Sequence, residues 1–118
     1  MGKSKWEKAT DPNSQPEILD ELSNDQDWRI RCAVASNRNT PKQTLIKLAR
    51  DEERIVRNSV ASNPNTPEEI LAALSNDEDW LVRSNLARNP HAKIETVYKL
   101  TEDEKWTVRK SAIESGRV

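Results

Sequence analysis

Phenylalanine, cysteine and histidine are nearly missing from the 118-residue sequence, which has no Phe, one Cys and one His. A single cysteine, Cys32, excludes an internal disulfide and any metal site made of clustered cysteines. His91 has no second histidine and no cysteine near it, so we expect a surface turn residue rather than a metal ligand or a triad member. The sequence also has no phosphate-binding loop and no nucleophile paired with a base. We therefore expect a protein that is not an enzyme and holds no metal and no cofactor.

Excess charge and long apolar segments are lacking as well. The formal net charge is −1, from 19 Lys and Arg against 20 Asp and Glu, which leaves no basic surplus for a phosphate backbone. No apolar run approaches the roughly 20 residues that span a bilayer. No apolar stretch follows the basic N-terminus, as it would in a signal peptide. These absences disfavour nucleic acid and membrane partners and predict a cytoplasmic location.

The composition itself is polar, with 34% hydrophobic and 33% charged residues. Such a balance approaches that of disordered chains. The apolar residues nevertheless recur at a fixed spacing, which a disordered chain does not require. We therefore expect an ordered chain that stacks short units.

A period of 26 residues runs through the sequence, and three residue types repeat at this spacing. They are the aspartates Asp25, Asp51, Asp77 and Asp103, the arginines Arg31, Arg57, Arg83 and Arg109, and the asparagines Asn37, Asn63 and Asn89. Four periods divide residues 15–118 into repeats 15–40, 41–66, 67–92 and 93–118, and residues 1–14 form an N-terminal half-repeat cap. A unit of this size is too short to bury its own apolar face, so the copies are expected to stack into one domain.

Each repeat is expected to contain two short helices and no strand. Thr66-Pro67-Glu68-Glu69 has the pattern of a capping box with proline at the first helical position, which predicts the start of the first helix. This helix is short enough to be α-helix or to include 3-10 turns. The second helix is expected to start at an acidic cluster, with Asp79 as an N-cap.

The motif also resembles a known family. Asp51 to Arg57, followed by the stretch 60–67 with the sequence Val-Ala-Ser-Asn-Pro-Asn-Thr-Pro, is similar to the leucine-rich repeat variant, a bacterial HEAT-like repeat. The resemblance covers about residues 15–118. It implies an all-α fold, a right-handed α-solenoid of paired short helices in which one helix of each pair is α or 3-10. Some members hold an iron–sulfur centre in an N-terminal cysteine cluster, which this sequence does not have.

The repeated polar residues have a structural and a functional interpretation. We expect the arginines to bridge the acidic turns of their own and a neighbouring repeat, because a planar guanidinium satisfies several acceptors at once. The alternative is a row of arginines for phosphate or carboxylate ligands, which the adjacent acids would neutralise. We expect the asparagine amides to pair with backbone groups rather than with a polar ligand. The acidic turns are expected to cap helices, because they lack the spacing and the glycine of a calcium loop.

Tryptophan is unusually frequent, and one repeat position carries Trp28, Arg54, Trp80 and Trp106. We expect this row to seal the edge between repeats by burying its indoles, with Arg54 stacked on an indole face between Trp28 and Trp80. The alternative is an open row that binds a partner, because Trp and Arg dominate binding hot spots.

The expected function is that of a non-enzymatic protein–protein interaction module or scaffold, whose partner is an unidentified protein. Solenoids place binding at positions that vary between copies, and here these include Ser36, Ser62, Arg88 and Glu114. Two alternatives remain: a nucleic-acid-binding HEAT-like solenoid, and a structural subunit of a larger complex. Charge counted repeat by repeat shows no continuous basic stripe, which disfavours the first.

Overall fold

A computed structural model describes residues 2–118, and this part of the chain contains α-helices and no strand. The helices are short, with six to nine residues each. Their bounds are α1 Lys5–Thr10, α2 Pro16–Leu22, α3 Trp28–Ser36, α4 Lys42–Leu48, α5 Arg54–Ser62, α6 Glu68–Leu74, α7 Trp80–Ala87, α8 Ile94–Leu100 and α9 Trp106–Glu114.

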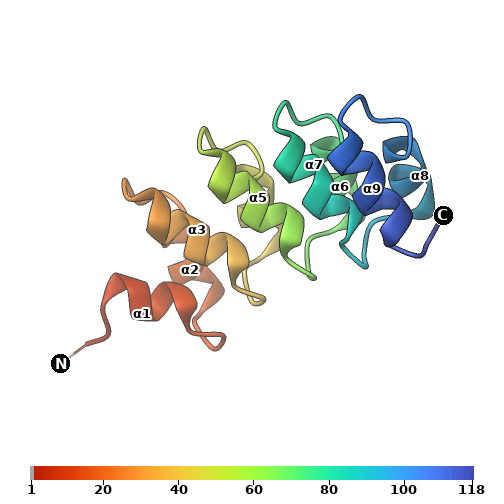
Figure 1. Ribbon diagram of the computed structural model, residues 1–118. Helices are drawn as coiled ribbons and strands as arrows, with labels where there is room; N and C mark the ends of the chain where they lie inside the picture. Colours follow the sequence, from red (N-terminus) through yellow and green to blue (C-terminus); the bar gives the residue numbers. More distant parts are fainter. Residues whose placement is uncertain (1) are drawn as a thin grey trace.

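The helices form two layers in an elongated stack of 51 × 22 × 19 Å (Figure 1). The second helices of the repeats lie side by side in chain order, with α1 as the first member of that row: α1, α3, α5, α7 and α9. The first helices, α2, α4, α6 and α8, each pack on the second helix that follows, and α2, α4 and α8 also pack on the second helix that precedes them. Contacts between successive helices in this order make the chain an α-solenoid, as expected.

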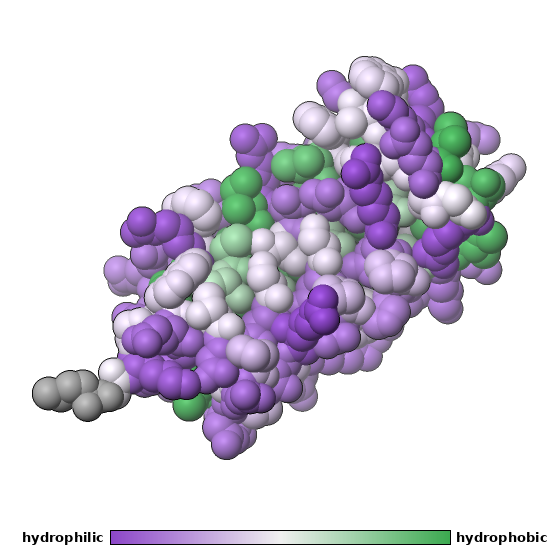
Figure 2. All heavy atoms as spheres, turned by 60° about the horizontal axis from the view of Figure 1, so that its bottom comes forward, coloured by the Kyte–Doolittle hydropathy of each residue, from purple (hydrophilic) through white to green (hydrophobic). Residues whose placement is uncertain are grey.

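The core between the layers consists of aliphatic side chains and alanine. Fully buried leucine and valine side chains come from both layers: Leu19, Leu45, Leu48, Leu71, Leu86, Leu100, Val34, Val56, Val60, Val82, Val97 and Val108. Each such side chain contributes about 1.5–3 kcal/mol by leaving water. No tryptophan or tyrosine belongs to this core among the described residues. The aromatic residues therefore lie outside the core, on the surface, and the face drawn in Figure 2 is mostly hydrophilic with scattered hydrophobic patches.

The first helices do not begin as the capping box predicts. Pro67 is the N-cap residue of α6, and no side chain caps that helix. The Thr66 hydroxyl is fully buried and donates a hydrogen bond of 2.7 Å to the Val60 carbonyl, and Thr40 does the same to Val34. The predicted capping box is wrong because the threonine hydroxyl donates instead to a backbone carbonyl of the preceding helix.

These first helices are α-helical. Leu71 donates its backbone N–H to the Pro67 carbonyl, and Leu45 donates to the Pro41 carbonyl, at 3.2 and 3.0 Å. Both bonds span four residues, which is the α-helical pattern rather than the 3-10 pattern. Of the two alternatives that the sequence leaves open, the structure has the α-helix.

The second helices begin at the acidic turns. Asp27 and Asp79 are N-cap residues, and each carboxylate accepts the N–H two residues further on at 2.9 Å. Glu53 is at the same place in α5 but makes no side-chain cap. In the turn before α7, the Asp77 carboxylate accepts the N–H of Asp79, two residues further on, at 2.9 Å and so stabilises the turn itself. Each acidic cluster thus closes a turn and starts a helix.

Candidate functional site

The repeated arginines and aspartates form ion pairs between successive repeats, which we call the Arg–Asp ladder. Arg57 donates from Nε to Asp77 of the next repeat at 2.8 Å and from Nη1 to the Asp51 carbonyl of its own repeat at 2.8 Å. Arg31 and Arg83 make the same contacts, with Nε distances of 2.7 and 2.8 Å to their aspartates. The side-chain hydrogen bond to Asp77 raises the pKa of Arg57.

The two ends of this ladder differ from its middle. Arg109 makes only the bond within its own repeat, from Nη1 to the Asp103 carbonyl at 2.6 Å. Asp25, at the other end, pairs with the exposed Lys5 of α1 at 2.9 Å. The three inner guanidiniums therefore use both edges on protein acceptors, and this geometry leaves them no free edge for an anion.

The asparagines form a second ladder, the Asn ladder, that points the opposite way along the stack. Asn63 is 2% exposed and donates from Nδ2 to the Ala35 and Asn37 carbonyls of the preceding repeat at 2.9 and 3.1 Å. Its Oδ1 accepts the N–H of Asn65 at 2.9 Å. Asn37 and Asn89 make equivalent bonds. Each amide thus ties its own turn to the end of the second helix before it.

A third set of contacts links the second helices directly. Side chains 27 residues apart form hydrogen bonds between neighbouring helices: Cys32 with Ser59, Asn58 with Asn85, and Ser84 with Ser111. Sequence reasoning missed this set because its members differ in residue type. The only available signal was that small polar residues occupy two adjacent repeat positions. Cys32 is accordingly a half-buried packing residue.

The tryptophan row lies at the N-terminal ends of the second helices. Trp28, Trp80 and Trp106 are 42%, 40% and 60% exposed. The row therefore does not bury its indoles, and the expectation of a sealed edge is wrong. The tryptophans face outward, while the residues two positions after them are buried in the core: Ile30, Val82 and Val108.

Arg54 also lies elsewhere than expected. Its Nη1 approaches Asp79 at 3.4 Å, so an ion pair takes the guanidinium that was expected to stack on an indole. Trp80 instead has the Lys105 ammonium over its ring, 5.2 Å from the centroid. The cation that accompanies this indole thus comes from the next repeat.

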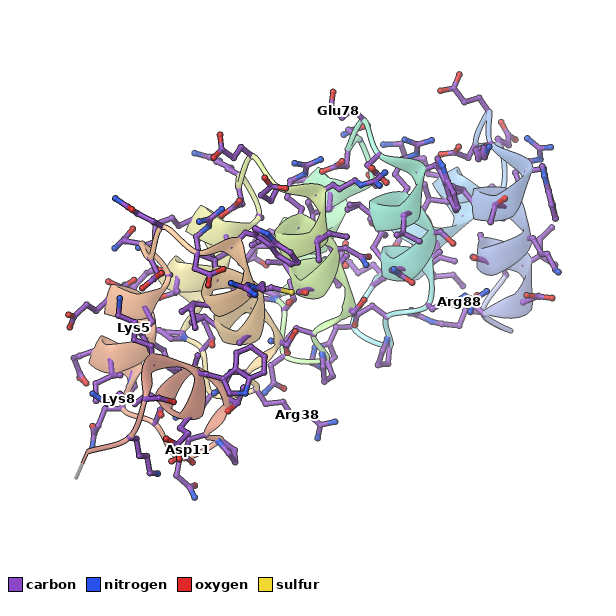
Figure 3. All side chains as sticks on the ribbon, turned by 60° about the vertical axis from the view of Figure 1, so that its left-hand side comes forward. Lys5, Lys8, Asp11, Arg38, Glu78 and Arg88 are labelled. Atoms are coloured by element: carbon purple, nitrogen blue, oxygen red, sulfur yellow. The ribbon has the colours of Figure 1, made fainter. Side chains whose placement is uncertain are left out.

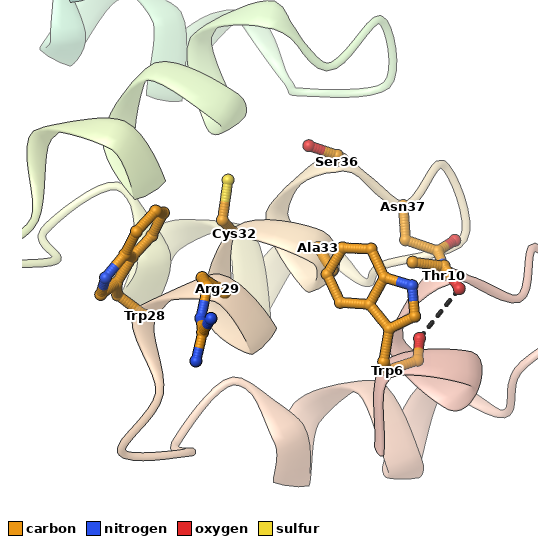
Figure 4. A pocket seen from close by; sticks show the side chains of 8 residues that line it. All are labelled: Trp6, Thr10, Trp28, Arg29, Cys32, Ala33, Ser36 and Asn37. Carbon is orange, nitrogen blue, oxygen red and sulfur yellow. Dashed lines mark hydrogen bonds between the residues drawn. The ribbon is translucent and has the colours of Figure 1, made fainter. Parts of the chain in front are cut away.

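Trp6 is a further member of this surface that the repeat pattern did not indicate. It lies on α1 at the repeat position that Cys32, Asn58, Ser84 and Lys110 occupy in the later copies. Trp6 is 55% exposed, and together with Trp28 it forms walls of an apolar pocket of about 400 Å³. Figure 4 shows Cys32 and Ala33 between the two indoles, and Arg29 beside Trp28. Two neighbouring second helices, α1 and α3, each supply one indole to this pocket.

Part of the repeat region matches a known protein family. The sequence profile of the leucine rich repeat variant family matches residues 55–79. This stretch is therefore similar to a leucine rich repeat variant unit. The matched stretch runs from α5 into the acidic turn before α7, and it includes Arg57, Asn63 and Asp77. A comparison with curated proteins gives no match.

The remaining candidate features of residues 2–118 lie outside the two ladders and the tryptophan row. His91 is exposed, and its backbone N–H donates to Asn89 Oδ1 at 2.9 Å. No group of three or more His, Cys, Asp or Glu in this part of the chain is placed to hold a metal ion. None of its helices is long and apolar enough to cross a membrane. A second pocket of about 330 Å³ lies between α4 and α6 and includes Ile46 and Ile70.

The lowered pKa values of Asp103 in the Arg–Asp ladder and of Asp20 on α2 lead us to expect a loss of stability in acid. Burial disfavours the ionised form of Asp103, yet hydrogen bonds from Arg83 and from the Lys105 N–H outweigh it and lower the pKa of Asp103. The pKa of Asp20 is lowered mainly by its hydrogen bond from Thr44. A carboxylate with a lower pKa in the folded state stabilises that state above its unfolded pKa, and the stabilisation is lost as pH falls through the folded value. We expect a constant free energy of unfolding from pH 7 to about 5 and a decline below about 4, measured by urea titration. A decline between pH 7 and 6 would contradict this origin.

Proposed function

We propose that the protein is a non-enzymatic interaction module that binds a partner protein on the outward face of its second helices. We call this surface, formed by α1, α3, α5, α7 and α9, the second-helix face. The observation that carries the proposal is the position of the four tryptophans. All four are at least 40% exposed, and all four belong to second helices.

The cost of leaving these indoles in water supports a binding role. The described core is complete without them, because aliphatic side chains and alanine fill it. No buried side-chain nitrogen or oxygen atom among residues 2–118 lacks a hydrogen-bond partner. An exposed tryptophan therefore adds little that the fold needs. Tryptophan and arginine are, however, the residues that most often dominate binding energy in protein interfaces.

The pocket between Trp6 and Trp28 gives the second-helix face a specific anchor point. Its volume of about 400 Å³ is within the range of concave sites that enclose a ligand group. Rigid helices hold both indoles, and Cys32 and Ala33 form an apolar base between them. A side chain of a partner protein can be enclosed here on several sides.

Loss of partner capture tests this function. The tagged chain and its Trp6→Ala/Trp28→Ala variant are each used to capture proteins from native lysate, with cross-linking. Tyr98→Ala is the matched control, because Tyr98 is 64% exposed but lies on α8 in the other layer. We expect a partner that the double variant loses and the control keeps. Equal capture by all three proteins would contradict the proposal.

A binding role also predicts that the tryptophans matter little for stability. Because Trp80 is 40% exposed, we expect Trp80→Ala to lower the free energy of unfolding by about 1 kcal/mol. The loss consists of part of its contact area and of the cation–π contact with Lys105, which contributes about 0.5–1 kcal/mol at an exposed site. A fully buried aromatic side chain would cost about 3–5 kcal/mol. Urea melts distinguish the two values, and a cost in the higher range would show that this indole is structural.

A further inference from the structure

Positive and negative charges are segregated along the repeat, although the chain as a whole is nearly neutral. We compare the second helices and the turns that follow them with the rest of the chain. These segments are 5–11, 28–40, 54–66, 80–92 and 106–118. They contain 12 of the 19 Lys and Arg but only 3 of the 20 Asp and Glu. Counting charge repeat by repeat hides this difference, because each repeat contains one half of each kind.

Part of this positive charge is free to meet a partner. The four ladder arginines point into the stack, and the other eight cations lie toward solvent or at the margin: Lys5, Lys8, Arg29, Arg38, Arg54, Arg88, Lys110 and Arg117. The Arg29, Arg54 and Arg88 side chains are 70%, 66% and 60% exposed. Figure 3 shows Lys8, Arg38 and Arg88 along the edge opposite Glu78, which belongs to an acidic turn; Asp11, which pairs with Lys3, lies between Lys8 and Arg38 on that edge. The second-helix face therefore has a cationic edge at the C-terminal ends of its helices.

The apolar pocket lies within this basic surface. Trp28 and Trp6 form its walls, Arg29 is beside it, and Arg38 follows one residue after the lining residue Asn37. Lys8 and Arg38 form no ion pair within residues 2–118, so their charge is not neutralised by a neighbouring carboxylate. Arg29, the cation that lines the pocket, pairs with Asp27, while Lys8 and Arg38 belong to the same second-helix segments as the lining residues.

We propose that the second-helix face binds an acidic segment of a partner protein, which places an aromatic or aliphatic side chain between Trp6 and Trp28. This inference rests on the proposed function and adds the chemistry of the partner. Carboxylates of the segment pair with the cationic edge, and the apolar side chain supplies the anchor. Charges at the rim of an interface mainly steer association and select the partner, while the enclosed anchor supplies most of the affinity.

A peptide fits this surface better than a nucleic acid does. Single-stranded nucleic acids bind where aromatic residues alternate with an uninterrupted track of cations. Here the tryptophan row adjoins acidic helix caps, and two of its cations are already paired: Arg29 with Asp27, and Arg54 with Asp79. Phosphates along that edge would meet carboxylates. Lys8, Arg38 and Arg88 lie at the opposite edge, at separate points that discrete carboxylates can match, and of these only Arg88 approaches a carboxylate within residues 2–118, that of Glu114 at 3.8 Å.

Selection from a display library of random 12-residue peptides tests this inference on the full chain. We expect the selected peptides to be enriched in Asp and Glu and to share an aromatic or aliphatic anchor. Binding of a selected peptide is then measured by fluorescence anisotropy. Trp6→Ala/Trp28→Ala should weaken it at least about tenfold, and Arg38→Glu/Arg88→Glu should weaken it about tenfold at low salt and less at high salt.

Controls separate the inference from the proposed function. Arg50→Glu reverses an exposed arginine of the other layer and Tyr98→Ala removes an exposed aromatic side chain there, and both should leave binding unchanged. Selected peptides that require the tryptophans but are neutral or basic would overturn the acidic partner and keep the interaction module. Peptides that bind equally well without the tryptophans would overturn both. Binding of poly(U) that depends on Trp6 and Arg38 and excludes the peptides would assign the face to nucleic acid instead.

Discussion

Replacing Arg57 with alanine is expected to lower the free energy of unfolding by about 3 kcal/mol, the usual cost of removing one partner of a buried ion pair. The side chains of Arg57 and Asp77 are only 11% and 7% exposed. The substitution leaves the Asp77 carboxylate in the stack without its cation, and it also removes the bond to the Asp51 carbonyl. Equilibrium urea unfolding with a constant slope measures the change directly.

Arg109→Ala is the matched control for this prediction. Arg109 has the same repeat position and the same bond within its own repeat, but it makes no bond to an aspartate of another repeat. We expect it to cost about 1 kcal/mol, close to one net hydrogen bond. Equal and small losses at both positions would show that the ladder does not stabilise the stack, and they would reopen the interpretation of the arginines as anion ligands.

The second large effect is expected for Asn63→Ala, which should lower the free energy of unfolding by about 3 kcal/mol. Removing the amide leaves the Ala35 carbonyl and the Asn65 N–H without this partner, and each buried unsatisfied group costs about 1–3 kcal/mol; the Asn37 carbonyl also loses a bond but still accepts the Thr40 N–H. Part of this cost is recovered where water reaches the turn, since Asn65 itself is exposed. Thermal and urea unfolding of the purified variant provide the measurement.

Asn65→Ala serves as the comparison within the same turn. Its Nδ2 donates to the Arg38 carbonyl at 2.6 Å, but the residue lies at the surface, where water can replace the bond. We expect a cost below about 1 kcal/mol. If Asn65→Ala were as costly as Asn63→Ala, the stability of the turn would not depend on the buried amide.

The period in the sequence was enough to predict the helices and their stacking. Leucines and valines that repeat at 26 residues must share one environment, and only a stack of helix pairs buries them all. The start of α6 was predicted wrongly because the Thr66 hydroxyl has two acceptable uses, a cap or a bond to the preceding helix. A single sequence does not rank these two bonds. The choice depends on how close the Val60 carbonyl lies in the folded turn.

The candidate site was predictable only in part, for two reasons. Trp6 belongs to the half-repeat, where a single helix is aligned, so its proximity to Trp28 depends on how α1 packs on α3. Arg54 was expected to stack on an indole because the row was considered alone. The competing carboxylate, Asp79, comes from the next repeat and forms a stronger attraction for a guanidinium than an indole face does.

The two ladders give the stack a chemical polarity. Arginines donate forward along the chain, as from Arg57 to Asp77, whereas asparagine amides donate backward, as from Asn89 to Asn63. If the backbone were cleaved at the exposed turn around Asn65, the two fragments would expose unlike surfaces. One would present a guanidinium and two carbonyl groups, and the other a carboxylate and an amide. Two copies of the same fragment would place like groups against each other, so such fragments are matched for reassembly in the original order and not for pairing with themselves.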